Sequence, residues 1–338
     1  MATITDVAQR AGVSVKTVSR VMNEYQHVSA TMRQRVHEAM EALNYESSAS
    51  IRSSRFYAAQ SIGMLYGDPS SGYQAALNHA VLKACSDAGR YLAVEYFDEE
   101  NLQWREQVET FLDRTKVTNL ILVPPMCDSA ELHVLLRERG IRTVLISPSR
   151  QISGAISIAM DDRLAAMEMT QYLIKLGHKR IGYMSGDTSH VAAVLRRQGF
   201  VEAMKSAGLP CGAGAVLDTG SFSFRDALRG AETLLERASR PTAIFTANDE
   251  MAAAVVMTAS KIGISVPEGL SVAGFDNTSI SRTLWPALTT VAQPFDLIAR
   301  EAVRLVSDDI KRDLSVAATR VLPHEILYRA STGAPPPQ

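Results

Sequence analysis

The sequence has few cysteines and no long apolar segment. Its three cysteines, Cys85, Cys127 and Cys211, are odd in number and far apart, which indicates neither a disulfide framework nor a CxxC metal or redox site. The longest apolar runs, at 119–126 and 155–160, are much shorter than the roughly 20 residues that span a bilayer. Because the first residues also form no continuous apolar leader, we expect a cytoplasmic protein.

The chain also lacks an excess of charge of either sign. It has 35 Lys and Arg against 36 Asp and Glu, so net charge does not indicate a nucleic-acid partner. Hydrophobic residues make up 46% of the 338 residues, which is enough to bury stable cores and predicts two or three domains. Local placement says more, since three cations and no anion lie between Gln9 and Val21.

The motifs of common catalytic sites are missing as well. The sequence contains no GxSxG, HExxH or GxxxxGK[ST] segment, and its histidines show no metal-ligand spacing. The glycines at 212–214 follow a predicted helix and enter a strand, which is the wrong order for a nucleotide-binding turn. We therefore expect no enzymatic activity, no cofactor and no metal site.

Residues 1–45 show only helical patterns. Apolar side chains recur there every three or four residues, and Thr3, Ser14 and Ser29 stand where helices would begin. The hydroxyl oxygens of such residues accept hydrogen bonds from first-turn amides. The pattern predicts three short helices, over 4–11, 15–23 and 30–44.

The first two of these helices meet the requirements of a helix-turn-helix. Ala8 is small where two helix backbones would approach, Gly12 permits the turn, and Val18 locks the second helix onto the first. The outer face of the second helix carries apolar, hydroxyl and cationic groups suited to a major groove: Val15, Lys16, Ser19 and Arg20.

From Ser61 onward, short β-branched segments alternate with longer helical patterns. The expected strands cover 61–66, 91–97, 119–125, 142–147, 155–160, 180–185, 215–219, 242–247 and 270–275. The expected helices between and after them cover 72–89, 162–176, 191–207, 223–238, 249–262 and 295–312. Such alternation predicts two doubly wound parallel-sheet α/β lobes with a cleft between them. We expect the Ser-rich segment 46–60 to be a linker and the tail 332–338 to be disordered.

The head contains the segments TITDVAQRAGVSVKTVSRVMN and HVSATMRQRVHEAMEALNY. They resemble the DNA-binding head of the LacI/GalR (lactose-repressor) family of bacterial transcription regulators. The resemblance continues over nearly the whole chain, in order, through GHKRIGYMSG, RRQGFVEAM, PTAIFTANDEMA, SVAGFDNT and PALTTVAQPF.

This resemblance implies a domain plan. It consists of an all-α helix-turn-helix head over 1–45, a hinge linker over 46–60 and a core of periplasmic-binding-protein type over 61–331. Lobe 1 of the core would comprise about 61–160 and 292–318, and lobe 2 about 161–291 and 319–331.

The resemblance also assigns roles in DNA binding. Val15, Lys16 and Arg20 become the readers of base edges, with Arg20 a candidate for a bidentate contact to guanine. The groups expected to contact phosphates or position the helix are Ser14, Thr17, Ser19, Asn23 and His27. For His27, a role as a cap or an ordinary surface residue stays equally open.

The hinge departs from the family pattern. Family members usually have Pro-Asn at the start of the hinge helix and a Leu that wedges into the minor groove. This chain has Ser47-Ser48 and Ser54 at those places. Because a serine lacks the apolar surface that offsets base unstacking, we hypothesise that the protein kinks DNA less, or uses Ile51 as the wedge. Arg52 and Arg55 still suit a path along phosphates.

The resemblance further implies an effector cleft between the lobes. Its candidate residues are Arg196, Phe222, Asn248, Asp276 and Gln293, with Tyr73, Ser71 and Ser147 as weaker candidates. A guanidinium and a carboxylate pair with the vicinal hydroxyls of a sugar, while an aromatic ring stacks on its C–H face. Asp249, which opens a predicted helix, is assigned to capping and not to ligand binding.

Together these features predict a homodimeric repressor of carbohydrate-utilisation genes that binds a pseudo-palindromic DNA operator. Two-fold symmetry follows because one short recognition helix reads too few base pairs. A small sugar or glycoside is expected to lower operator affinity. Three alternatives stay open: a purine-responsive, corepressed regulator, a regulator controlled by a partner protein, and a solute-binding protein, which the intact head disfavours.

Overall fold

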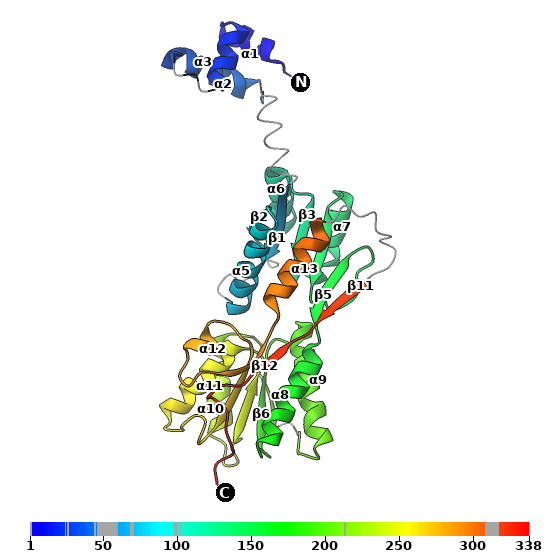
Figure 1. Cartoon of the computed structure of the whole chain (residues 1–338), viewed down its shortest axis with the longest axis vertical. Helices are drawn as coiled ribbons and strands as arrows, with labels where there is room; N and C mark the ends of the chain where they lie inside the picture. The colour runs from blue at the N-terminus through cyan, green and yellow to red at the C-terminus, as the bar shows by residue number, and fades with distance from the viewer. Residues whose placement is uncertain are drawn as a thin grey trace. The chain divides into compact units, whose positions relative to one another are not determined.

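The computed structural model describes residues 2–23, 25, 27–43, 45, 60–67, 71–97, 101, 103–212, 214–307 and 318–337 (Figure 1). The chain divides into two compact units, Met1–Gln60 and Ser61–Gln338, which we call the head and the core. Ile51 and Arg52, predicted to contact DNA from the hinge, lie outside the described residues. Among those described, no helix is both long and apolar enough to span a membrane.

The described part of the head contains three helices, α1 (Ile4–Ala11), α2 (Val15–Met22) and α3 (Ala30–Ala42). Each begins at its predicted hydroxyl cap: the side chains of Thr3, Ser14 and Ser29 accept hydrogen bonds from first-turn amides. The predicted helices are therefore confirmed, and their ends differ by at most two residues. Gly12 takes the left-handed conformation at the end of α1, with φ 64°.

The helices of the head enclose a small apolar core. Ala8 and Val18, predicted to lie where α1 and α2 meet, are both buried, and so is Val36 of α3. A Cβ atom at Gly12 would lie 2.5 Å from Nη2 of Arg35, which donates a hydrogen bond to the carbonyl oxygen of Ala11 at 2.6 Å. The turn thus requires glycine for its backbone angle, and the absence of a Cβ atom leaves room for the Arg35 guanidinium.

Lobe 1 of the core is a six-stranded parallel sheet in the order β11-β5-β4-β3-β1-β2. Its strands are β1 (Ser61–Tyr66), β2 (Tyr91–Tyr96), β3 (Asn119–Leu122), β4 (Arg142–Ile146), β5 (Ile156–Met160) and β11 (Ala318–Leu322). Helices α5 (Gly72–Asp87) and α13 (Phe295–Ser307) pack together on it, and α6 (Trp104–Thr115) and α7 (Ala130–Glu138) are joined by ion pairs. A short 3₁₀ helix, η1 (Met126–Asp128), precedes α7.

Lobe 2 is a second six-stranded sheet, in the order β12-β10-β9-β8-β6-β7. Its strands are β6 (Ile181–Ser185), β7 (Val216–Asp218), β8 (Ala243–Thr246), β9 (Ser271–Asp276), β10 (Thr289–Ala292) and β12 (Glu325–Leu327). Its helices are α8 (Asp162–Lys175), α9 (Val191–Ser206), α10 (Phe224–Leu235), α11 (Asp249–Lys261) and α12 (Ile280–Thr283). The α8–α9 pair covers one face and the α10–α11 pair the other (Figure 1).

The two doubly wound lobes are as predicted, with one addition: the edge strand β12 runs antiparallel to β10. Three strands, β10, β11 and β12, are absent from the nine expected ones. The expected helix over 295–312 corresponds to α13, which is described as far as Ser307.

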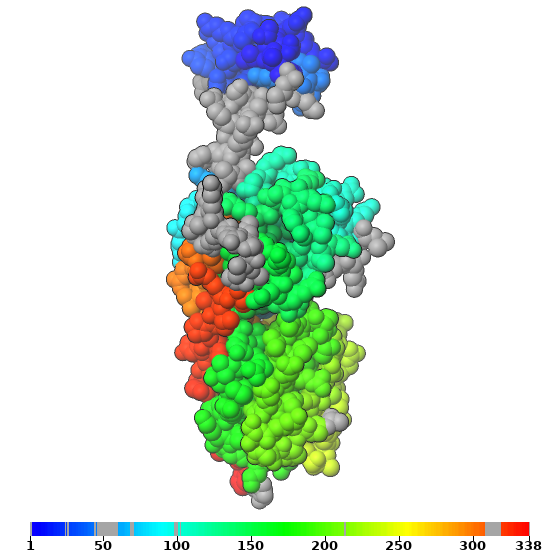
Figure 2. Space-filling model, turned by 90° about the vertical axis from the view of Figure 1, so that its right-hand side faces the viewer, coloured from blue at the N-terminus to red at the C-terminus, as the bar shows by residue number. Residues whose placement is uncertain are grey.

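The chain crosses between the lobes three times: from β5 to α8, from β10 to α13 and from β11 to β12. Figure 2 shows the last of these, where the red C-terminal segment passes from lobe 1 to lobe 2 along one side of the core. The structure differs from the expected boundary at 318/319, because β11 pairs with β5 in lobe 1 along its whole length. The third crossover therefore lies at 323–324.

The prediction of a disordered tail over 332–338 is wrong for its described part. Thr332 Oγ1 lies 3.0 Å from the hydroxyl of Tyr172, and the Gly333 amide donates to Ser271 Oγ at 3.0 Å. The Gly333 carbonyl oxygen lies 3.0 Å from Nε2 of the buried His178. Composition pointed to disorder, but buried polar groups of lobe 2 need the partners that this segment supplies.

Candidate DNA-binding surface and effector cleft

The outer face of α2 presents the three predicted base readers. Val15 is 41% exposed, and Lys16 and Arg20 are exposed beside it on the same side of the helix. The guanidinium of Arg20 lies 5.8 Å from the centre of the Tyr25 ring, which is itself exposed. Tyr25 is not among the predicted residues, because a single aromatic residue after a helix has no periodicity to mark it.

Four of the expected phosphate or positioning residues bond within the head. Ser14 Oγ accepts from the Thr17 amide at 3.1 Å, and the two hydroxyls are 2.9 Å apart. Asn23 Nδ2 donates to the carbonyl oxygen of Ser19 at 2.9 Å. These bonds lie at the two ends of α2. His27 follows the helix and is exposed. The DNA contacts of all five residues stay predictions.

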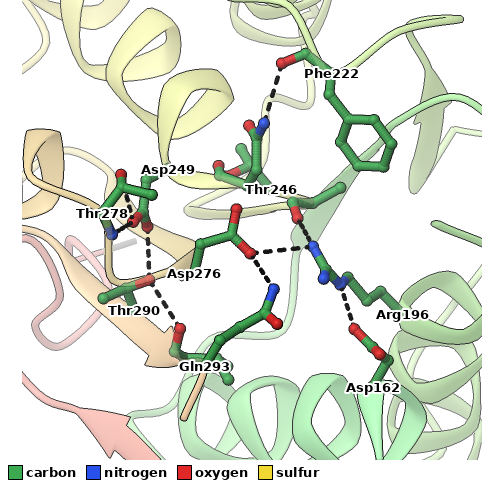
Figure 3. A network of polar contacts seen from close by, with 12 residues as sticks. Asp162, Arg196, Phe222, Thr246, Asp249, Asp276, Thr278, Thr290 and Gln293 are labelled. Atoms are coloured by element: carbon green, nitrogen blue, oxygen red, sulfur yellow. Dashed lines mark hydrogen bonds and ion pairs between the residues drawn. The ribbon is translucent and has the colours of Figure 1, made fainter. Parts of the chain in front are cut away.

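In the core, three of the predicted effector residues meet in one buried network (Figure 3). Asp276 ends β9, and its Oδ1 accepts from Gln293 Nε2 at 2.6 Å and lies 3.5 Å from Nη1 of Arg196. Arg196 comes from α9, and its Nε donates to Asp162 Oδ1 at 2.7 Å. All four side chains are nearly inaccessible, so each charge depends on its neighbours for stabilisation.

The Arg196 guanidinium is fixed in position and orientation. Its Nη1 also donates to the carbonyl oxygen of Ala247 at 2.6 Å, and its Cζ lies 3.7 Å from the centre of the Phe275 ring. A planar cation held between a carboxylate, a carbonyl and an aromatic face presents its remaining donors in a defined direction. Such a fork matches two neighbouring hydroxyl oxygens.

Asp276 is strained. Its φ is 106°, in the left-handed region that non-glycine residues rarely adopt. Residues in such conformations persist where the surroundings over-determine them, and they cluster at functional sites. Burial raises the pKa of Asp276 well above its usual value. In this structure its Oδ2 makes no hydrogen bond to a described residue.

Asn248 and Phe222 form a second part of the site. Asn248 Oδ1 accepts from the Met251 amide at 2.8 Å, and its Nδ2 donates to the carbonyl oxygen of Phe222 at 3.0 Å. The half-buried Phe222 ring lies against Gly186, where a Cβ atom would clash with it. Asn248 therefore holds the Phe222 segment beside the Asp276 network, with both of its polar groups already engaged.

The assignment of Asp249 to helix capping is wrong. The N-cap of α11 is Asn248, and Asp249 is a fully buried acceptor. Its Oδ2 accepts from the amide and the hydroxyl of Thr278, and its Oδ1 accepts from Thr290 Oγ1 at 2.6 Å. Burial raises the pKa of Asp249 to about 7. This carboxyl ties α11 to the ends of β9 and β10.

Among the described residues, none of the three weaker candidates in lobe 1 makes a hydrogen bond to the Asp276 network. Burial raises the pKa of Tyr73, and the charges of Asp276 and Asp162 raise it further. Its ring packs edge-on against Phe295 at 5.5 Å. Ser147 follows β4 and has φ 48°.

Two acidic residues of the cleft were not predicted. Asp162 holds Arg196, and Glu250 accepts a hydrogen bond from the Gly72 amide of lobe 1 at 2.9 Å. Both stand in the first turn of a helix, where an acidic side chain is ordinarily read as stabilising the helix end. The signal that marks Asp162 is its place two residues after β5, the strand that leads out of lobe 1.

Models of known protein families match both the head and the core. A profile described as bacterial regulatory proteins of the lacI family matches residues 3–48, and a periplasmic binding protein-like domain matches residues 170–332. The ribose operon repressor of Escherichia coli is 32% identical over 304 residues, covering 90% of this chain and 91% of the repressor. The chain belongs to the LacI family. It is a DNA-binding transcription regulator, as the resemblance implied, and not an enzyme.

Two further comparisons agree with this assignment. The repressor PurR of Photobacterium profundum is 31% identical over 311 residues, which cover 92% of both chains. The crystal structure of the Lac repressor dimer bound to operator and the anti-inducer ONPF superposes with a TM-score of 0.72 at 26% identity. That superposition covers 98% of this chain and 99% of the Lac repressor chain. The LacI-family chain therefore shares the whole architecture of head and two-lobed core.

Proposed function

We propose that this LacI-family regulator is a cytoplasmic, dimeric repressor of carbohydrate-utilisation genes, released from its operator by a small sugar or glycoside. The observation that carries the sugar assignment is the pairing of Asp276 with Arg196 and Gln293 beside the Phe222 ring. A carboxylate, a fixed guanidinium and an amide bond vicinal hydroxyls, and an aromatic ring accepts the C–H face. The name of the ribose operon repressor is consistent with this class of regulated genes.

We propose that effector binding changes operator affinity by favouring one arrangement of the two lobes over another. An effector changes DNA affinity only by as much as it prefers one arrangement over the other. Glu250 of lobe 2 accepts a hydrogen bond from the Gly72 amide of lobe 1, and Gln293 of the second crossover bonds Asp276, so a ligand bound to Asp276 is coupled to the distance between the lobes. Closure upon the ligand is the step that we propose weakens operator binding.

A thermal-shift screen of the full-length protein against monosaccharides, disaccharides, aryl glycosides and purines tests the effector class. A ligand at 100 times its Kd adds about 2.7 kcal/mol, which raises the Tm by several degrees. We expect a shift with a sugar or glycoside that Asp276→Ala abolishes and Arg20→Ala retains. A shift with purines alone would overturn the sugar assignment, and no shift across the panel would favour control by a partner protein.

For the head, we propose that Val15, Lys16 and Arg20 read base edges of a pseudo-palindromic operator, while Ser14, Thr17, Ser19, Asn23 and His27 set the register on phosphates. Selection of binding sites from random duplex DNA by the full-length protein tests the first role. The expected outcome is a two-fold symmetric site, as for a dimer with one head in each half-site. An asymmetric site would contradict the proposal.

The hinge hypothesis has its own test. Ile51 and Ser54 are both outside the described residues, so it rests on the sequence alone. A bend-angle assay on the selected operator should show either weak bending or a central kink that disappears in Ile51→Ser. A sharp kink that survives this substitution would remove both versions.

A further inference from the structure

Glu250 joins the two lobes at the first turn of α5. Its Oε1 accepts a hydrogen bond at 2.9 Å from the amide of Gly72, the first residue of that helix. Ser71, the N-cap of α5, makes no capping bond with its own side chain. A carboxylate of lobe 2 therefore takes the place of the missing cap on a helix of lobe 1.

The close approach of the two lobes here depends on glycine. A Cβ atom at position 72 would clash with Oε1 of Glu250 and would lie 3.3 Å from Cγ2 of Thr278. The main chain of α5 thus lies directly against the carboxylate, with no side chain between them. The positive end of the α5 dipole faces an anion that belongs to the protein itself.

The second oxygen of Glu250 is buried and makes no hydrogen bond with any described residue. A buried carboxylate oxygen without a donor is unfavourable, and a hydroxyl group of a bound ligand would satisfy it. The negative charge of Glu250 also raises the pKa of both Asp249 and Asp276. Glu250 follows Asp249, which bonds Thr278, and Thr278 lies two residues after Asp276, so Glu250 stands at the same end of β9 as the carboxylate that we propose binds the effector.

We infer that Glu250 determines the charge of the effector: the cleft accepts neutral, hydroxyl-bearing ligands and rejects phosphate esters and other anions. This inference rests on the proposed function of the cleft. The N-terminus of a helix is ordinarily a ready site for a phosphate or carboxylate group. Here that site is already filled by Glu250, and an anionic ligand would meet like charge where it would otherwise be bound. Repulsion of this kind is an established means of specificity.

Three full-length variants test the inference. Glu250→Gln removes the charge but keeps an oxygen for the Gly72 amide, so it preserves the contact between the lobes. Glu250→Ala opens the α5 N-terminus as well. Glu236→Gln removes a carboxylate from an exposed position at the end of α10 and serves as the control for net charge.

The first arm uses matched probes at constant ionic strength: ribose with ribose 5-phosphate, and glucose with glucose 6-phosphate. Calorimetry should show that the wild-type protein binds the neutral member of a pair at least about tenfold more tightly than the phosphate ester. In Glu250→Gln this preference should fall by about tenfold or more, and in Glu236→Gln it should not change. An unchanged preference in Glu250→Gln would overturn the inference.

The second arm uses inorganic phosphate alone, and so does not depend on the identity of the effector. Phosphate should raise the Tm of Glu250→Ala, relative to chloride at equal ionic strength, by several degrees more than it raises that of the wild type. An equal response in the two proteins would overturn the inference. Failure of every neutral sugar to bind the wild type, combined with a phosphate response in Glu250→Ala, would reject the sugar effector while supporting the role of Glu250.

Discussion

Replacing Asp162 by alanine should lower the stability of the core and weaken effector binding more than the removal of a carboxylate from the surface would. The carboxylate of Asp162 holds Nε of Arg196 at 2.7 Å, and the two side chains are only 7% and 6% exposed. Removing one member of a buried ion pair leaves the other charge uncompensated, which costs about 3 to 5 kcal/mol.

The structure places the cost at the lower end of that range. Arg196 keeps the carbonyl oxygen of Ala247 at 2.6 Å and the carboxylate of Asp276 at 3.5 Å, so the guanidinium is not stranded. About 3 kcal/mol corresponds to a fall in the Tm of the core of roughly 6 to 12 °C. Without Asp162 the guanidinium also loses its fixed orientation, so the stabilisation by the effector should disappear.

Differential scanning fluorimetry with and without the effector measures both quantities. The matched control is Asp161→Asn, since Asp161 caps α8 through the Leu164 amide and asparagine caps equally well. That variant should keep the Tm and the ligand response. A Tm of Asp162→Ala within about 2 °C of the wild type, with the ligand response intact, would refute the proposed role of this pair.

Three further predictions concern other parts of the molecule. Because burial raises the pKa of Asp249 to about 7, from about 3.9 in the unfolded chain, its contribution to stability is full below pH 4 and is lost as pH rises through 7. Asp249→Asn should therefore flatten the fall in Tm between pH 5 and 8, and an unchanged slope would contradict this assignment. Truncation after Ser331 removes the Gly333 partner of the buried His178 and should cost about 1 to 3 kcal/mol in urea unfolding, whereas a disordered tail would cost nothing. Arg20→Ala should relax base preference at one operator position by about 1 to 3 kcal/mol in binding selection, and a uniform loss at all positions would assign Arg20 to phosphates.

The sequence predicted the elements whose side chains follow a period, and it missed those defined by distant partners. The three head helices have both a cap and a periodic apolar face, which is why their bounds are nearly right. Strands β10, β11 and β12 are three to five residues long, but β3, β7 and β8 are as short and were predicted, so length does not explain the omission. Their place is fixed by pairing with strands that lie elsewhere in the sequence, which also explains the misplaced third crossover.

The site shows a similar division. Asp276, Arg196 and Gln293 came from the family resemblance, and the structure brings them together. That Asn248 and not Asp249 caps α11 could not be foreseen, because both residue types are good N-caps at a helix start. Asp249 instead faces the sheet, where it accepts hydrogen bonds from Thr278 and Thr290. The preference of a residue type for the N-cap position does not show which distant donors its side chain will meet in the fold.

The arrangement of the three crossovers explains how a ligand at Asp276 would act on the lobes. The first crossover carries Asp162, which is bonded to Arg196, and the second carries Gln293, which is bonded to Asp276 itself. The third carries His324, which lies 2.9 Å from Glu168 of α8 and outside the network. A ligand that draws Asp276 or Arg196 toward itself thus pulls directly on two of the three connections between the lobes. Because a conformational change needs a difference in affinity between two states, these two bonds are where binding energy would be converted into lobe movement.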